Sequence, residues 1–150
     1  MGTRHYQTVI NKEGETKVAQ YGQWDGYPDG KGLDILNFLQ NADLKKYQLN
    51  LNKIKPITEE QIESINKLPD WYEKYPHLSR DCGAKIHKLI ENNKVDFVSL
   101  MDESDARNWC EGFYTINFKT NEFVSEYYSV TKTFSLDNLP TKEEYINAFN

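Results

Sequence analysis

The stretch WCEGFYTINFKTNEFVSEYYSV, residues 109–130, decides the fold. Polar and apolar residues alternate in both halves, and phenylalanine, tyrosine and valine are abundant, as is typical of half-buried strands. Thr120 and Asn121 between the halves suit a short turn. We therefore predict a β-hairpin. Since neighbouring side chains on a strand point to opposite faces, both faces of the sheet receive aromatic residues.

A second hairpin is predicted at the start of the chain. TRHYQTVIN and TKVAQYG both read as strands, and KEGE between them reads as a turn. The two hairpins enclose a stretch with helical patterns. We therefore predict one α+β domain over residues 1–150: an antiparallel sheet built from the N- and C-terminal hairpins, with the central helices packed on one face.

The helices are predicted from their apolar spacing and their caps. The expected positions are a helix from Gly32 onward, one over residues 42–49, one after the Thr58 cap, one in RDCGAKIHKLIEN after Ser79, and a closing helix after Thr141. Arg80 and Asp81 would then occupy the first turn of their helix. VDFVSL is predicted to be an additional strand, and DWYEKYPHL a connector.

Composition excludes several function classes. The 150-residue chain has a net charge of −5, which disfavours bulk nucleic-acid binding and attraction to anionic membranes. Two cysteines are too few for a disulfide scaffold. The N-terminal segment has no apolar run long enough for a signal peptide or a membrane span. We expect a cytoplasmic protein with no membrane association.

The segment YGQWDGYPDGKG, residues 21–32, is the strongest functional signal. On a structural interpretation, the Asp-Gly pairs form turns, Pro28 fixes a dihedral, and Trp24 and Tyr27 anchor the loop. On a functional interpretation, a glycine-rich aromatic loop that leads into a helix supplies N–H groups for an anion and flat faces for stacking. The loop lacks the P-loop and dinucleotide-binding motifs, so its residues alone leave both interpretations open.

Two of the three arginines, Arg4 and Arg80, fall in sequence stretches that are also candidates for a binding site. If Arg4 and Arg80 converge beside Trp24, they form a cationic, aromatic-walled pocket for a phosphate or carboxylate group. Arg4→Ala would then abolish binding without unfolding the protein. The alternative is a structural ion pair between Arg4 and Asp25 or Asp81.

Residues capable of acid–base or nucleophilic chemistry have no spacing that selects a mechanism. They are His5, Asp25, Asp81, Cys82 and His87. Cys82, near a predicted helix N-terminus, would have a lowered thiol pKa, but a packed side chain is the commoner role. A zinc site from His77, Cys82, His87 and Cys110 lacks the usual ligand spacing. We predict no metal site, no cofactor and no catalytic residue.

Four segments together resemble one family of small proteins. MGTRH, KVAQYGQWDGYPDGKG, LSRDCGAKIHKLI and WCEGFYTINFKTNEF look like a pattern widespread in bacteria, their phages and some fungi, in a family with no established activity. Lys31 stands where glutamine is commoner and Cys82 where threonine is commoner, which argues against a required thiol. The resemblance implies a shared site at Thr3, Arg4, Gln23, Trp24, Asp25, Gly26, Tyr27, Pro28, Arg80 and Asp81. It also suggests a role in host–phage conflict as a counter-defence protein.

Taken together, these patterns favour a non-enzymatic binding protein with a pocket for a small anionic or nucleotide-like ligand. Arg4 and Arg80 would bind the anion, and Trp24 and Tyr27 would stack on the ligand. One alternative is an inhibitor of a host protein or other host macromolecule that acts through aromatic residues of WYEKYPHL and the second hairpin. Another is a small nucleotide hydrolase with Asp25 or Asp81 as base. Aromatic residues on both sheet faces also predict a homo-oligomer.

Overall fold

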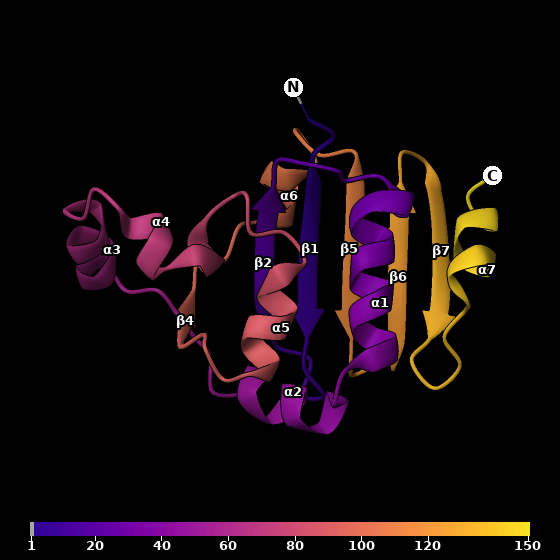
Figure 1. Ribbon diagram of the computed structural model, residues 1–150, viewed down its shortest axis with the longest axis horizontal. Helices are drawn as coiled ribbons and strands as arrows, with labels where there is room; N and C mark the ends of the chain where they lie inside the picture. Colours follow the sequence, from indigo (N-terminus) through magenta and orange to yellow (C-terminus); the bar gives the residue numbers. More distant parts are fainter. Residues whose placement is uncertain (1) are drawn as a thin grey trace.

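Five strands form one sheet in the order β2-β1-β5-β6-β7 in the computed structural model, which describes residues 2–150 (Figure 1). The strands are β1 (His5–Ile10), β2 (Thr16–Gly22), β5 (Gly112–Asn117), β6 (Glu122–Tyr127) and β7 (Val130–Ser135). Both predicted hairpins are confirmed: β1 pairs antiparallel with β2, and β5 pairs antiparallel with β6.

The two hairpins join through a parallel pairing of β1 with β5, in which Tyr6 lies opposite Phe113. The sheet is therefore mostly antiparallel, as predicted, and it contains one parallel pairing at this junction. A parallel pair requires a long crossover, which the helical middle of the chain provides. The sequence also did not predict β7, which extends the second hairpin by one strand after a turn at Tyr128, where φ is 53°.

Helices cover one face of the sheet, as predicted. In Figure 1, α1 (Leu33–Asn41) and α5 (Lys85–Glu91) lie in front of the strands, with α2 (Leu44–Leu51) below them and α7 (Lys142–Asn147) beside β7. The side chains between these helices and the sheet form the main core, which includes Val9, Leu36, Tyr47, Ile86 and Phe123. Apolar spacing thus correctly predicted that α1, α2, α5 and α7 contribute side chains to the core.

A smaller group of elements extends beyond β2 (Figure 1). It contains α3 (Glu59–Asn66), α4 (Trp71–Lys74), the single 3₁₀ turn η2 (Pro76–Leu78) and the two-residue strands β3 (Lys55–Pro56) and β4 (Phe97–Val98). The capping box that opens α3 is confirmed, because Thr58 and Gln61 bond each other's backbone N–H. VDFVSL forms a strand over two of its residues only, and the DWYEKYPHL connector contains α4 and η2.

The helix predicted to begin after Ser79 begins later, at Lys85, so this prediction was wrong. Ser79 does not cap a helix. Its Oγ accepts a hydrogen bond from the backbone N–H of Asp81 at 3.1 Å within a turn. Gly83 then adopts a left-handed φ of 55°, which interrupts any helix at that point. Arg80, Asp81 and Cys82 therefore precede α5 on an irregular segment.

The second face of the sheet carries a small apolar cluster. Tyr6, Ala19 and Phe113 pack there with Ala106 of α6 (Glu103–Ala106), which is drawn behind β2 in Figure 1. The guanidinium of Arg107 also lies 3.7 Å from the centroid of the Phe113 ring. Tyr6 and Phe113 on this face are thus buried by the chain itself. The homo-oligomer was predicted because aromatic residues occur on both sheet faces, and for these two residues the chain's own packing explains that pattern.

Candidate functional site

The loop between β2 and α1 closes on itself before it enters the helix. Asp25 has a φ of 55°, and its carbonyl oxygen accepts a hydrogen bond from Lys31 N–H at 2.7 Å. Gly30 N–H donates to the Tyr27 carbonyl at 2.9 Å. A Cβ on Gly30 would lie 2.4 Å from the Asp25 carbonyl oxygen, so this turn requires glycine. Asp29 and Gly30 thus lie in the single helical turn η1 (Pro28–Gly32), whereas Asp25 and Gly26 precede it in irregular backbone.

Three segments far apart in the sequence meet at this loop. Gly26 N–H donates to the carbonyl of Thr3 at 2.9 Å, and Gln23 N–H donates to the carbonyl of Arg80 at 3.1 Å. The candidate residues are therefore brought together around residues 23–26. Their side chains nevertheless point to different places, and they do not enclose one pocket.

The hydroxyl group of Tyr114 anchors the loop to β5. It donates to the Gly26 carbonyl at 2.7 Å, and Tyr114 is almost fully buried. Gly112 lies against the same carbonyl, since a Cβ there would fall 2.1 Å from that oxygen. The middle of the loop is therefore held against β5 of the sheet.

Arg4 forms an ion pair with Glu111, 3.1 Å from Nη2 to Oε1, and both side chains are partly buried. The other carboxylate oxygen of Glu111 accepts the Arg4 backbone N–H at 2.8 Å. Burial acts to raise the pKa of Glu111, but hydrogen bonds from Arg4 and its positive charge outweigh burial and hold this pKa below its ordinary value. The ion pair considered for Arg4 thus forms, with Glu111 rather than with Asp25 or Asp81.

Trp24 and Asp81 connect the first end of the loop to a pocket of about 520 Å³. The indole Nε1 of Trp24 donates to Asp81 Oδ1 at 2.8 Å. Arg80 beside them is exposed and has no ion pair within residues 2–150. The pocket lies between the α4–η2 segment and α5. Its lining residues are Tyr72, Pro76, Ser79, Asp81, Cys82, Lys85, Lys88 and Leu89.

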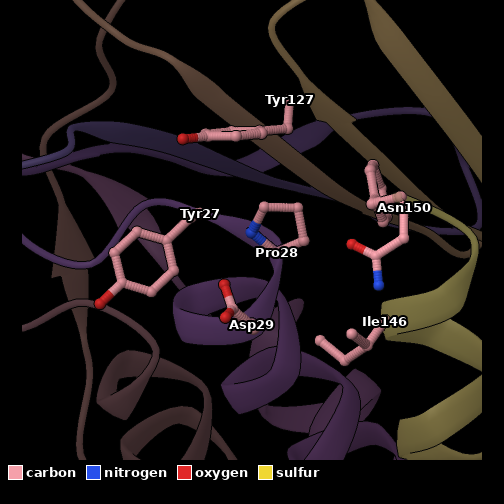
Figure 2. Close-up of a pocket in the computed structure, with 7 residues that line it drawn as sticks. Tyr27, Pro28, Asp29, Tyr127, Ile146 and Asn150 are labelled. Atoms are coloured by element: carbon pink, nitrogen blue, oxygen red, sulfur yellow. The ribbon is translucent and has the colours of Figure 1, made fainter.

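The other end of the loop lines a different pocket, of about 470 Å³ (Figure 2). Tyr27 and Pro28, both predicted site residues, border this second pocket and not the first. It is completed by Asp29 from the loop, Tyr127 from β6, and Ile146, Phe149 and Asn150 from the C-terminal segment. Sequence reasoning missed Tyr72, Lys85, Lys88, Tyr127 and Ile146. Of these, the lysine pair had a signal, because residues three apart share one face of a helix.

Cys82 is not an activated nucleophile in this structure. Burial raises the pKa of its thiol to about 11, against weaker opposing effects of Lys85 and Lys31. The expectation of a lowered pKa fails because Cys82 precedes α5 by three residues and is 7% exposed.

The hydrolase alternative would need Asp25 or Asp81 as base. Asp25 accepts a hydrogen bond from the Tyr27 hydroxyl and Asp81 one from the Trp24 indole.

The buried histidines belong to the core. His87 bonds Tyr47 Oη through Nδ1 at 2.9 Å and Gln7 Oε1 through Nε2 at 2.8 Å. His5 is fully buried, and neither ring nitrogen has a hydrogen-bond partner among residues 2–150. Burial lowers the pKa of His5 to about 4 and that of His87 to about 3. Both rings are therefore neutral at physiological pH.

The comparisons with known proteins identify no relative. No protein-family model, curated protein or solved structure matches the chain. Within residues 2–150, no three His, Cys, Asp or Glu side chains cluster closely enough to hold a metal ion. The helices of the same region are all too short or too polar to cross a membrane. The family resemblance stays a prediction.

Proposed function

We propose that the protein binds a small anionic ligand with a flat or apolar part, the chemistry of a nucleotide, in the pocket between α4–η2 and α5. The observation that carries this proposal is the presence of Lys85 and Lys88 beside Tyr72 around one pocket. A ligand with a phosphate group and a base would use both kinds of side chain. The pocket volume of about 520 Å³ suits a ligand of that size.

The charges around this pocket differ from the acidic average of the chain. Lys85 is exposed and has no ion pair within residues 2–150, whereas Lys88 Nζ lies 2.7 Å from Glu91 Oε1. Lys85 therefore supplies the cation that is free to meet an anion. Arg80 lies next to the pocket residue Asp81 in sequence and offers a second free cation near the rim. A local cationic site within a chain of net charge −5 favours a specific anion over a polyanion.

The apolar surface of the pocket supports the proposal that the ligand has a flat or apolar part. Tyr72 is 52% exposed, and Pro76 and Leu89 border the same space. Trp24 is 48% exposed and is held beside the pocket by its bond to Asp81. These surfaces would contact a base or an acyl group while the lysine binds the anion.

Isothermal titration calorimetry with AMP, adenosine and inorganic phosphate tests the proposal. AMP should bind more tightly than either of its parts, and Lys85→Ala should weaken AMP binding by about tenfold, since a charge-assisted bond contributes about 1.5 kcal/mol. Lys12→Ala, in the exposed turn between β1 and β2, is the matched control and should bind AMP normally. Absence of AMP binding, or equal losses in the two variants, would overturn the proposal.

The alternative of an inhibitor that acts through aromatic residues of WYEKYPHL and the second hairpin has less support from the hairpin, although Tyr72 of WYEKYPHL is exposed. Phe113, Tyr114, Phe118 and Phe123 are buried, and only Tyr128 of that set is exposed as a large aromatic. Trp109, which is 57% exposed, adds to the exposed aromatic surface but lies outside the strands. A counter-defence role would be compatible with the small-anion site, as a protein can sequester a signalling nucleotide by binding it without turnover.

A further inference from the structure

The second pocket, at the Tyr27 end of the loop, has two aromatic walls. In Figure 2 the ring of Tyr127 is seen edge-on above Pro28, so that one of its faces is turned toward the cavity. Tyr27 lies on the left, and its hydroxyl group points away from Pro28 to reach Oδ1 of Asp25 at 3.1 Å. The hydroxyl of Tyr27 is thus occupied outside the pocket, and its ring borders the cavity.

All formal side-chain charge in this pocket is negative. Asp29 lines the cavity, is exposed, and forms no ion pair within residues 2–150. The lysine nearest in sequence, Lys31, turns elsewhere: its Nζ lies 3.5 Å from Asp34 Oδ2, and its side chain packs against Gly83. The pocket therefore has a free carboxylate and no cation to neutralise it. An anion would be repelled here, and a cation would be attracted.

Apart from Asn150, the rest of the lining is apolar. Pro28, Ile146 and Phe149 form this part of the surface, and Figure 2 shows Ile146 below Pro28, on the other side of Asp29 from Tyr27. An aliphatic substituent can pack on these residues while a positive charge stays near Asp29 and the aromatic faces. A hydrated inorganic cation would gain nothing from that apolar contact, whereas an organic cation would.

We propose that this pocket binds an organic cation, an ammonium group that carries short apolar substituents. The cation lies against the face of Tyr127, where the ring quadrupole attracts positive charge, and within the field of Asp29. Its alkyl groups contact Pro28 and Ile146. This site shares no lining residue with the proposed anion pocket, so either proposal can fail without the other.

An amide NMR titration with choline and with 3,3-dimethyl-1-butanol, its uncharged isostere, tests this inference. Choline should shift the signals of residues 27–29, 127 and 146–149. The isostere should bind at least about fivefold more weakly, since a cation–π contact contributes about 1 kcal/mol at a half-exposed site. Equal affinities, or shifts confined to other residues, would show that the pocket does not recognise positive charge and would overturn the proposal.

Variants separate the two sources of attraction. Asp29→Asn should weaken choline binding by about fivefold and leave the isostere unaffected, because only the charge interaction is lost. Tyr127→Phe should retain choline binding and Tyr127→Leu should lose about fivefold, as the leucine side chain has no quadrupole. Asp70→Asn is the matched control: Asp70 is exposed and its side chain caps nothing. A loss in Asp70→Asn equal to that in Asp29→Asn would contradict the assignment.

Discussion

The Trp24 indole donates a hydrogen bond to Asp81, 57 residues further along the chain, and so ties the glycine-rich loop to the segment before α5. This contact places a carboxylate at the edge of a pocket that also holds Lys85 and Lys88. For an anionic ligand, that carboxylate opposes binding. For a hydrolase, the same carboxylate would be essential. A variant without the Asp81 carboxylate therefore distinguishes an anion-binding protein from a hydrolase.

Asp81→Asn should strengthen AMP binding by about threefold at low ionic strength, and added salt should reduce this gain. The amide oxygen of the asparagine can still accept the Trp24 N–H, so the loop keeps its tether. Calorimetry at two ionic strengths measures the effect. Weaker binding, or the loss of a measurable turnover of AMP or ATP, would instead support a direct role of the carboxylate.

Arg4→Ala should destabilise the fold and leave AMP binding unchanged. Its ion pair with Glu111 is partly buried, and removal of the guanidinium leaves the carboxylate without its partner. We expect a lower free energy of unfolding than in the wild type, measured by urea denaturation. This outcome differs from the leading expectation from sequence alone, in which Arg4→Ala abolishes binding without unfolding the protein.

The double variant Arg4→Ala with Glu111→Ala is the control for this interpretation. If the ion pair accounts for the effect, the double variant should lose less stability than the sum of the two single variants. A loss of AMP affinity in Arg4→Ala at unchanged stability would contradict the placement of the anion pocket beside Lys85.

Tyr114→Phe should loosen the loop. The hydroxyl is buried and bonds the Gly26 carbonyl, so its removal leaves that oxygen without this partner, at a cost of about 1 to 3 kcal/mol. Hydrogen exchange should become faster at Gly26 and Lys31, whose amides close the loop. Tyr128→Phe is the matched control, as Tyr128 is 66% exposed. Equal exchange rates in both variants would show that the loop does not depend on the Tyr114 hydroxyl.

Much of the fold could be predicted because its signals are local. Alternation marked β1, β2, β5 and β6, and reciprocal side-chain caps at Thr58 and Thr141 marked the starts of α3 and α7. β7 was not predicted because its residues are mostly polar and exposed. The start of α5 was misplaced because the left-handed φ of Gly83 is set by the tertiary structure, where Lys31 packs against it.

The candidate site was harder to predict, because its partners lie far apart in the sequence. Sequence reasoning correctly grouped the segments at Thr3, Gln23 and Arg80, whose backbones bond within the same loop. It could not find Glu111 as the partner of Arg4, which lies 107 residues away. Nor could it separate the two pockets, since the direction of each side chain depends on the anchoring of Gly26 by Tyr114.

The stability of the protein should fall between neutral pH and about pH 4 because of its buried histidines. An unfolded histidine takes up a proton near pH 6.5, whereas folded His5 does so only near pH 4 and His87 near pH 3. In between, the unfolded chain binds more protons, so the free energy of unfolding decreases as the pH falls. Each histidine should contribute a loss of about 1.5 kcal/mol between pH 6.5 and about pH 5, measurable by urea denaturation.

His5→Leu removes one of these contributions without loss of a hydrogen bond, since both ring nitrogens lack partners among residues 2–150. Its stability should therefore change less steeply over this range than that of the wild type, and parallel curves would show that His5 is protonated equally in both states.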